Sequence, residues 1–213
     1  MASEIIDIVL DPTDLNAIDL SSVNSVCRWS SNFRFFELSA GEEHYRLLAH
    51  VARSVRRPTI IDIGHFQGLS AAALSLATEK TVRSFDLISS LPSDPSVPTA
   101  IHIPNVRLEI GPNYMRDLPD HLRTSDLVIL DIDHLGKSER DIFKVLEEAK
   151  FDGLLIVDDI HLNEHMQRFW DDIKQTKYDI SSSGHWSGTG LVIFAPERFR
   201  VSWKKVQKLP TVN

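Results

Sequence analysis

The stretch Thr59-Ile-Ile-Asp62-Ile-Gly64-His-Phe-Gln-Gly68-Leu-Ser-Ala-Ala-Ala-Leu74 decides how this chain folds. Its apolar beginning predicts a buried strand, and its alanine-rich end predicts the start of a helix. Between them, Asp62, Gly64 and Gly68 form the pattern D-x-G-x-x-x-G. A backbone that turns at Gly64 and begins a helix near Gly68 presents free N–H groups and the positive end of a helix dipole. The stretch therefore predicts a ligand-binding turn, related to the G-x-G-x-x-G turn of dinucleotide-binding folds but without its first glycine.

Outward from this turn, apolar strands and amphipathic helices alternate. The predicted strands are 60–63, 82–87, 106–110, 126–131 and 153–158, and the predicted helices are 70–78, 114–122, 139–150 and 164–174. Segments 178–182 and 190–194 are expected to form a terminal antiparallel pair. Near-continuous apolar strands between helices indicate an α/β fold with a doubly wound, mostly parallel sheet covered on both faces.

Composition limits the class of protein. The 213 residues, 42% of them hydrophobic, suit one domain with a sizeable core. A net charge of −7 argues against a nucleic-acid partner. Cys27 is the only cysteine, and no apolar run approaches the ~18 residues that span a membrane, so we expect a cytoplasmic protein with no membrane partner. Residues 1–40 are interpreted as a substrate-side cap, 41–200 as the main domain and 201–213 as a tail.

Acidic residues end most of the predicted strands. In such sheets ligands bind beyond the carboxyl ends of the strands. Asp86 ends the second strand, 22 residues after Gly64, where a carboxylate accepts hydrogen bonds from the hydroxyls of a ribose. The alternative is an ordinary solvated acid in a loop.

A second acidic group follows the fourth and fifth strands. Asp131, Asp158 and Asp159 converge if these strands are neighbours, and clustered carboxylates repel one another unless a cation or protons are present. Oxygen ligands favour Mg²⁺ or another divalent cation. His134, three residues after Asp131, is a candidate general base, with Asp133 as an alternative ligand or orienting partner. Alternatively, one or more of these acids caps the following helix or is solvated in a loop, and His134 has a structural role only.

The order of these motifs over residues 42–194 resembles the metal-dependent O-methyltransferases that use S-adenosylmethionine (SAM), the class of the catechol and macrolide-sugar enzymes. The resemblance implies a seven-stranded Rossmann-like sheet, with residues 41–200 as the methyltransferase domain. It implies a serine that holds the methionine carboxylate, a ribose acid, an adenine-flanking loop at Gly111-Pro-Asn-Tyr114, and a base three residues after the first metal acid. The implied SAM-binding residues are Asp62, Gly64, Gly68, Ser70, Asp86, Asn113, Tyr114 and Asp131. The implied metal ligands are Asp131, Asp158 and Asp159, and the implied catalytic base is His134.

The expected function is transfer of a methyl group from SAM to a hydroxyl of a small molecule, assisted by a divalent metal and a histidine base. Sugar, polyketide and phenol acceptors stay open, because acceptor pockets follow no sequence code. Homo-oligomerisation also stays open. The alternatives are a metal-independent SAM methyltransferase acting on nitrogen or oxygen, and a catalytically silent SAM-fold binding subunit. A nicotinamide-dependent oxidoreductase is disfavoured by the missing first glycine.

Overall fold

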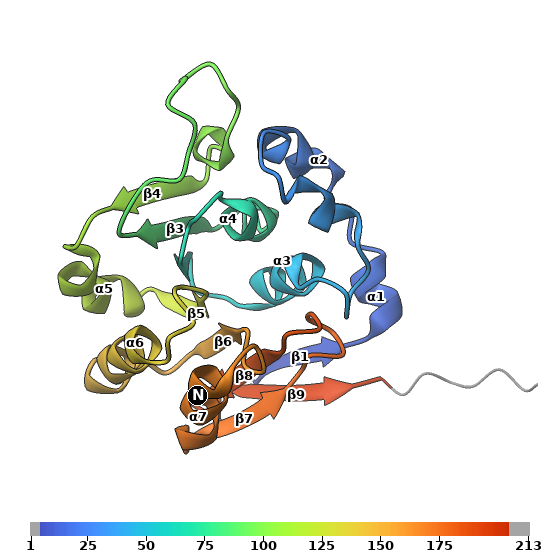
Figure 1. Ribbon diagram of the computed structural model, residues 1–213. Helices are drawn as coiled ribbons and strands as arrows, with labels where there is room; N and C mark the ends of the chain where they lie inside the picture. The colour runs from blue at the N-terminus through green and yellow to red at the C-terminus, as the bar shows by residue number, and fades with distance from the viewer. Residues whose placement is uncertain (1–4, 205–213) are drawn as a thin grey trace, which may run out of the picture.

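A seven-stranded sheet forms the centre of the molecule in the computed structural model, which describes residues 5–204 (Figure 1). In spatial order its strands are β4 (Val106–Ile110), β3 (Thr81–Asp86), β2 (Thr59–Ile63), β5 (Ser125–Leu130), β6 (Leu154–Asp158), β8 (Thr189–Ile193) and β7 (Thr176–Asp179). Pairings from β4 to β6 are parallel, and β8 runs antiparallel to both β6 and β7. The predicted doubly wound sheet with a terminal antiparallel pair is confirmed.

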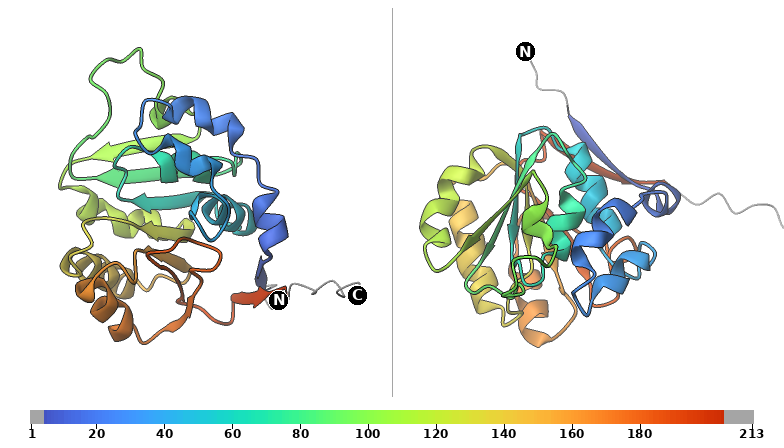
Figure 2. Two further views of the ribbon diagram at one scale, coloured as in Figure 1. Left: turned by 45° about the vertical axis from the view of Figure 1, so that its right-hand side comes forward. Right: turned by 90° about the horizontal axis from the view of Figure 1, so that it is seen from above.

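Helices cover both faces of this sheet, which Figure 2 shows edge-on in its right-hand view. On one face lie α3 (Tyr45–Ser54) and α4 (Leu69–Leu74), with α1 (Pro12–Asn16) and α2 (Ser21–Asn24) further out. On the other face lie α5 (Tyr114–Leu122), α6 (Lys137–Glu148) and α7 (Glu164–Asp172). Short 3-10 turns occupy Ser25–Cys27, Phe33–Glu37 and Ala100–His102. Each face has its own apolar core.

The three central strands are hydrophobic because both of their faces are buried. Every residue of β2, β5 and β6 is buried, which matches the near-continuous apolar runs in the sequence. The helices need only one apolar face. In α3, for example, Leu47, Leu48 and Val51 face the core. This arrangement places all parallel strand ends on one edge, where the predicted site residues lie.

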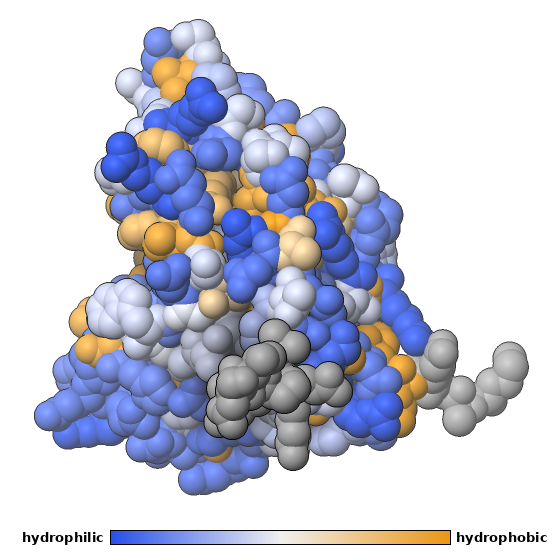
Figure 3. Space-filling model, turned by 90° about the vertical axis from the view of Figure 1, so that its right-hand side faces the viewer, coloured by the Kyte–Doolittle hydropathy of each residue, from blue (hydrophilic) through white to orange (hydrophobic). Residues whose placement is uncertain are grey.

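The N-terminal segment belongs to the same packed body as the main sheet. Strand β1 (Ile6–Leu10) pairs in parallel with β9 (Phe199–Trp203) in a separate two-stranded sheet. The alternate side chains Ile6, Ile8 and Leu10 enter the core beside α3. Figure 3 looks onto the side that carries α1 and α2, where the surface is mostly hydrophilic with smaller hydrophobic groups.

Strand β9 crosses the expected boundary between domain and tail at residue 201, because its pairing with β1 continues to Trp203. The expected tail from residue 205 onward, and residues 1–4 of the expected cap, lie outside the described residues. Within residues 5–204, no helix combines the length and the apolar character needed to cross a bilayer.

Candidate functional site

A cavity of about 600 Å³ opens at the carboxyl ends of β2, β3 and β5. Its lining includes four of the predicted SAM-binding residues, namely Gly64, Asp86, Tyr114 and Asp131. The predicted base His134 also lines it. Apolar side chains complete the wall, namely Ile63, Phe66, Phe85, Leu87, Ile88 and Ile132. A mostly apolar cavity with a few carboxylates suits a small ligand that has both an apolar ring and hydroxyl groups.

The glycine turn shapes one side of this cavity. Gly64 has a φ of 108°, and a Cβ added there would lie 1.5 Å from the backbone oxygen of Asp131. Only glycine therefore lets the ends of β2 and β5 approach this closely. The turn is tied to Asp86, whose Oδ2 accepts the N–H of Phe66 at 2.8 Å and whose Oδ1 accepts the N–H of Leu87 at 2.7 Å.

Asp62 and Ser70 lie beneath the turn and do not line the cavity. Asp62 is completely buried, and its Oδ2 accepts hydrogen bonds from Ser70 Oγ at 3.1 Å and Ser84 Oγ at 2.6 Å. Ser84 Oγ also contacts His65 Nδ1 at 2.8 Å. Burial raises the pKa of Asp62 to about 6, although both serines oppose the shift. The two predicted cofactor residues thus form an internal polar network that supports the turn.

The three predicted metal ligands lie together, at the ends of β5 and β6. Asp131 and Asp159 flank His134, whose Nε2 is 3.5 Å from Asp131 Oδ1 and 3.4 Å from Asp159 Oδ2. Asp158 is buried beside them, and its carboxylate and that of Asp131 have ligand atoms within 4.8 Å of each other. Asp158 therefore belongs to two groups of candidate ligands, one with Asp131 and one with Asp159.

Two histidines that the sequence did not single out complete this cluster. His44, at the N-terminus of α3, places Nδ1 3.2 Å from Asp158 Oδ1, and His185, between β7 and β8, contacts the same oxygen through Nε2. Both imidazoles are 5% exposed. Neither residue stands near the other or near Asp158 in the sequence. The neighbouring Trp186 is 78% exposed.

The carboxylates and imidazoles of this cluster shift one another's pKa values. Burial opposes ionisation of Asp158, but the His44 and His185 imidazoles outweigh it and hold the pKa of Asp158 below its ordinary value. Burial alone would lower the pKa of both histidines, and Asp158 reverses this, so the pKa of each is raised. Burial and then the charge of Asp158 raise the pKa of Asp131 well above its usual range. The cluster therefore holds negative charge that protons on the imidazoles, or a cation, must balance.

The backbone of His134 is held on both sides. Its φ of 56° lies in the left-handed region, and its N–H donates to Glu139 Oε1 at 2.9 Å. Its carbonyl accepts from Asn163 Nδ2 at 3.0 Å, and Asn163 is also the N-cap of α7. Glu139 and Asn163 thus fix the direction in which the His134 ring enters the cavity. Asp133 takes no part in this, since its carboxylate accepts from Ser138 Oγ and the N–H of Leu135.

Other candidate residues lie outside the cavity. Gly68 packs against Ala100 and His65, and Asn113 is the exposed N-cap residue of α5. Two histidines that follow Asp159 are also absent from the lining: His161 bonds to Asp179 at 2.8 Å and to Gln167 at 3.1 Å, and His165 is exposed. The assignments of Gly68 and Asn113 to the cofactor therefore stay predictions.

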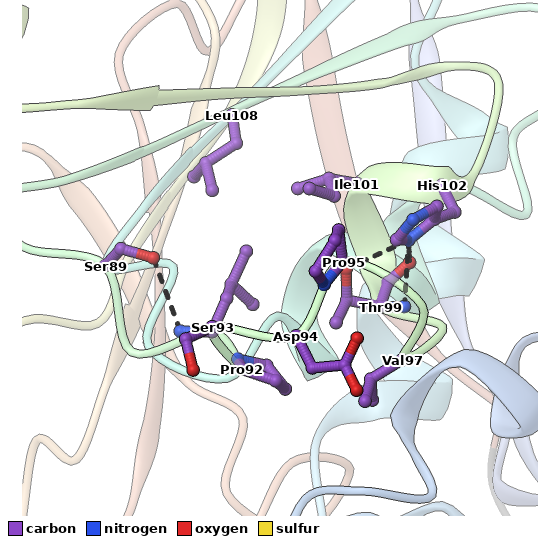
Figure 4. Close-up of a pocket in the computed structure, with 11 residues that line it drawn as sticks. Ser89, Pro92, Ser93, Asp94, Pro95, Val97, Thr99, Ile101, His102 and Leu108 are labelled. Carbon is purple, nitrogen blue, oxygen red and sulfur yellow. Dashed lines mark hydrogen bonds between the residues drawn. The ribbon is translucent and has the colours of Figure 1, made fainter.

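A second cavity of about 300 Å³ lies under the loop between β3 and β4 (Figure 4). Its hydrogen bonds are local: Leu91 N–H donates to Ser89 Oγ, and Thr99 N–H donates to His102 Nδ1. Asp94 is its one acidic lining residue. This cavity thus lacks the convergent titratable groups that mark the larger one.

Comparison with known proteins gives the fold. No protein-family model matches the sequence, and no curated protein matches it significantly. Among solved structures, the chain is similar to the O-methyltransferase TomG from Streptomyces achromogenes in complex with SAM, with 18% identity, a TM-score of 0.55, and coverage of 86% of this chain and 93% of TomG.

Two further structures agree with this result. An O-methyltransferase from Bacillus cereus in complex with S-adenosylhomocysteine (SAH) has 14% identity and a TM-score of 0.55, over 85% of this chain and 94% of its own. The SAH-bound methyltransferase PaMTH1 from Podospora anserina has 13% identity and a TM-score of 0.54, over 82% and 86%. The chain therefore shares the Rossmann-like α/β fold of these SAM-dependent methyltransferases.

Proposed function

We propose that this chain is a SAM-dependent O-methyltransferase that acts on a hydroxyl of a small molecule with the help of a divalent cation. One observation carries the proposal: a single cavity has a predicted ribose acid, Asp86, on one side and the acid cluster with its histidine, Asp131 and His134, on the other. A methyl donor and a deprotonating group are thereby brought to one space. The structures with the same fold that bind SAM or SAH support this choice of cofactor.

The cofactor side of the cavity is built from residues with matching chemistry. Asp86 presents a carboxylate to accept ribose hydroxyls, and Tyr114, which packs against the buried Phe85, supplies aromatic surface for a purine. SAM bound there supplies an electrophilic methyl group on a sulfonium. The role of this chain is to orient that group toward the acid cluster.

The donor set of the cluster fits a divalent cation. Carboxylate oxygens of Asp131 and Asp158 lie within 4.8 Å of each other and of His44 Nδ1, and Asp159 extends the cluster through His185. A cation held there lowers the pKa of a coordinated hydroxyl and fixes its orientation. These three carboxylates would hold it.

His134 is the proposed general base. Its Nε2 faces the cavity between Asp131 and Asp159, and both carboxylates stabilise the imidazolium that forms when it accepts a proton from the acceptor hydroxyl. Its side-chain Nδ1 is buried and has no hydrogen-bond partner within the described residues. The fixed backbone orients the ring without that second bond.

The proposal is tested by methyl transfer from labelled SAM to a panel of sugars, phenols and polyketides, with and without chelator. His134→Ala is expected to reduce turnover by about 10²- to 10⁴-fold while SAM affinity stays near that of the wild type. Unchanged turnover in this variant would remove the base assignment. Activity that persists in chelator would favour a metal-independent methyltransferase, a second candidate supported by the ion pairs of His44 and His185 with Asp158. SAM binding without transfer to any acceptor would favour a silent binding subunit.

A further inference from the structure

Two buried imidazoles point at one carboxylate oxygen in the acid cluster. His44 Nδ1 lies 3.2 Å from Asp158 Oδ1, and His185 Nε2 contacts the same atom. The ligand atoms of His44 and His185 also lie within 4.8 Å of each other, in a group that includes Glu43. The cluster is therefore not a set of oxygens alone but a mixed set of nitrogens and oxygens.

Hydrogen bonds account for the placement of His185, which bonds to Asp158 and Ser187, but not for that of His44. His44 Nδ1 makes no hydrogen bond with good geometry to any described residue, in spite of its short distance to Asp158. A buried polar atom without a hydrogen bond destabilises the fold, so a nitrogen aimed into a cluster of carboxylates calls for a partner. A cation accepts the lone pair of that nitrogen and the charge of Asp158 at the same time.

The second ring has the support that metal-binding histidines usually have. His185 Nδ1 hydrogen-bonds with Ser187 Oγ at 2.7 Å, which fixes the ring and leaves Nε2 toward Asp158. A hydrogen bond on the far nitrogen is the common device that orients an imidazole toward a metal. Ser187 and His185 are both buried, so this orientation is set by the protein interior.

The chemistry of the donors decides which class of cation they prefer. Mg²⁺ is bound through oxygen and keeps much of its water, whereas imidazole nitrogen suits first-row transition metals. We propose that His44 and His185 are ligands, together with Asp158, of a transition-metal dication such as Co²⁺ or Zn²⁺, in place of the Mg²⁺ that the three carboxylates alone would favour. This assignment rests on the cation site of the proposed function and names its additional ligands.

The first test compares cation affinities of the full-length protein after chelator treatment, by calorimetric titration with Mg²⁺ or Co²⁺ alone. His44→Ala and His185→Ala are each expected to weaken Co²⁺ binding by about tenfold or more, with little change for Mg²⁺. His165→Ala, which removes an exposed imidazole on α7, is the matched control and should change neither value. Unchanged Co²⁺ binding in both cluster variants, or an equal loss of Mg²⁺ and Co²⁺, would overturn the assignment.

A second measurement needs no variant. X-ray absorption of the Co²⁺-loaded wild type is expected to show the outer-shell scattering of imidazole rings, and a spectrum with oxygen neighbours only would overturn the assignment. SAM binding is measured on the same samples. If SAM binds but the histidine variants bind Co²⁺ as the wild type does, only this inference is wrong. If imidazoles bind Co²⁺ but SAM does not bind, the proposed function is wrong and the cation ligands remain.

Discussion

Gly64 determines how closely the ends of β2 and β5 approach each other at the cavity. Its missing side chain leaves room for the backbone oxygen of Asp131, and its φ of 108° is a conformation that other residues rarely adopt. Gly111, at the end of β4, has a similar φ of 115° but open space around it. Substitutions at the two glycines therefore distinguish the loss of stability from backbone strain from the loss caused by steric clash with a neighbouring strand.

We predict that Gly64→Ala destabilises the fold by more than about 4 kcal/mol or prevents soluble expression, since backbone atoms must move. Gly111→Ala should cost only the backbone strain, about 1–2 kcal/mol. Denaturant unfolding of both variants measures the difference. Equal losses would contradict the close approach of β2 and β5 at this point.

The buried network under the turn predicts two opposing pH effects. Burial raises the pKa of Asp62 from 3.8 to about 6, so its contribution to stability is complete below 3.8 and is lost as the pH rises through 6. Burial lowers the pKa of His65 from 6.5 to about 4, so its contribution is complete above 6.5 and is lost as the pH falls through 4. Each effect amounts to about 3 kcal/mol, and the two oppose each other between about pH 4 and 6.

Single variants should separate the two opposing effects of pH on the free energy of unfolding. Relative to the wild type, Asp62→Asn is expected to gain stability as the pH rises from about 4 to 7, and His65→Asn as the pH falls over the same range. Urea unfolding at a series of pH values gives both differences. Parallel curves for all three proteins would show that neither group has a shifted pKa.

At the level of elements, the N-cap residue of α7, Asn163, connects this helix to the loop that carries His134. Asn163 Oδ1 accepts the N–H groups of His165 and Met166, while Nδ2 donates to the carbonyl of His134. One side chain thus caps a helix and holds the proposed base. Aspartate at this position keeps the cap but replaces the donor with an acceptor.

Asn163→Ala is therefore expected to cost about 1 kcal/mol of stability and to reduce turnover. Asn163→Asp should keep the stability near that of the wild type and still reduce turnover, because its carboxylate repels the His134 carbonyl. Thermal melts and methyl-transfer rates of the two variants separate the roles. Wild-type turnover in Asn163→Asp would show that the bond to His134 does not position the base.

The sequence predicted most elements because their signals are local. The five parallel strands begin and end within one residue of the predicted ranges, and α5 spans the predicted 114–122. Helix α4 ends at Leu74, earlier than the predicted 78, where the Ser75 hydroxyl donates to the carbonyl of Ala72. The pairing of β1 with β9 joins the two ends of the chain, so no local pattern could predict it.

The site also combines residues that local sequence patterns predict with residues that only the folded chain brings together. Asp86, Asp131 and His134 could be placed because they follow strands whose ends share one edge of a parallel sheet. Asp62 belongs to the glycine-turn motif and Ser70 follows it. Their side chains turn inward, and no feature of the sequence predicts that direction. His44 and His185 come from loops 141 residues apart, and only the folded chain brings them to Asp158.

At the scale of the whole molecule, the N-terminal segment is part of the main domain. Ile8 in β1 is completely buried in the core shared with α3 and α4, while Ile5 just before it is 45% exposed. Ile8→Ala is expected to cost about 2–5 kcal/mol in a single cooperative transition, and the matched control Ile5→Ala much less. A separate early transition, or equal effects of the two variants, would instead indicate that this segment folds apart from the sheet.

The proposed methyltransferase function depends on SAM binding beside Asp86. The most direct measurement is the calorimetric dissociation constant of SAM for the wild type and for Asp86→Ala. We predict one SAM per chain, no binding of NAD, and a loss of about ten- to a hundredfold in the variant, because hydrogen bonds to a charged group contribute about 1.5–3 kcal/mol. Absence of SAM binding to the wild type, or equal affinity in Asp86→Ala, would contradict the proposed SAM site beside Asp86.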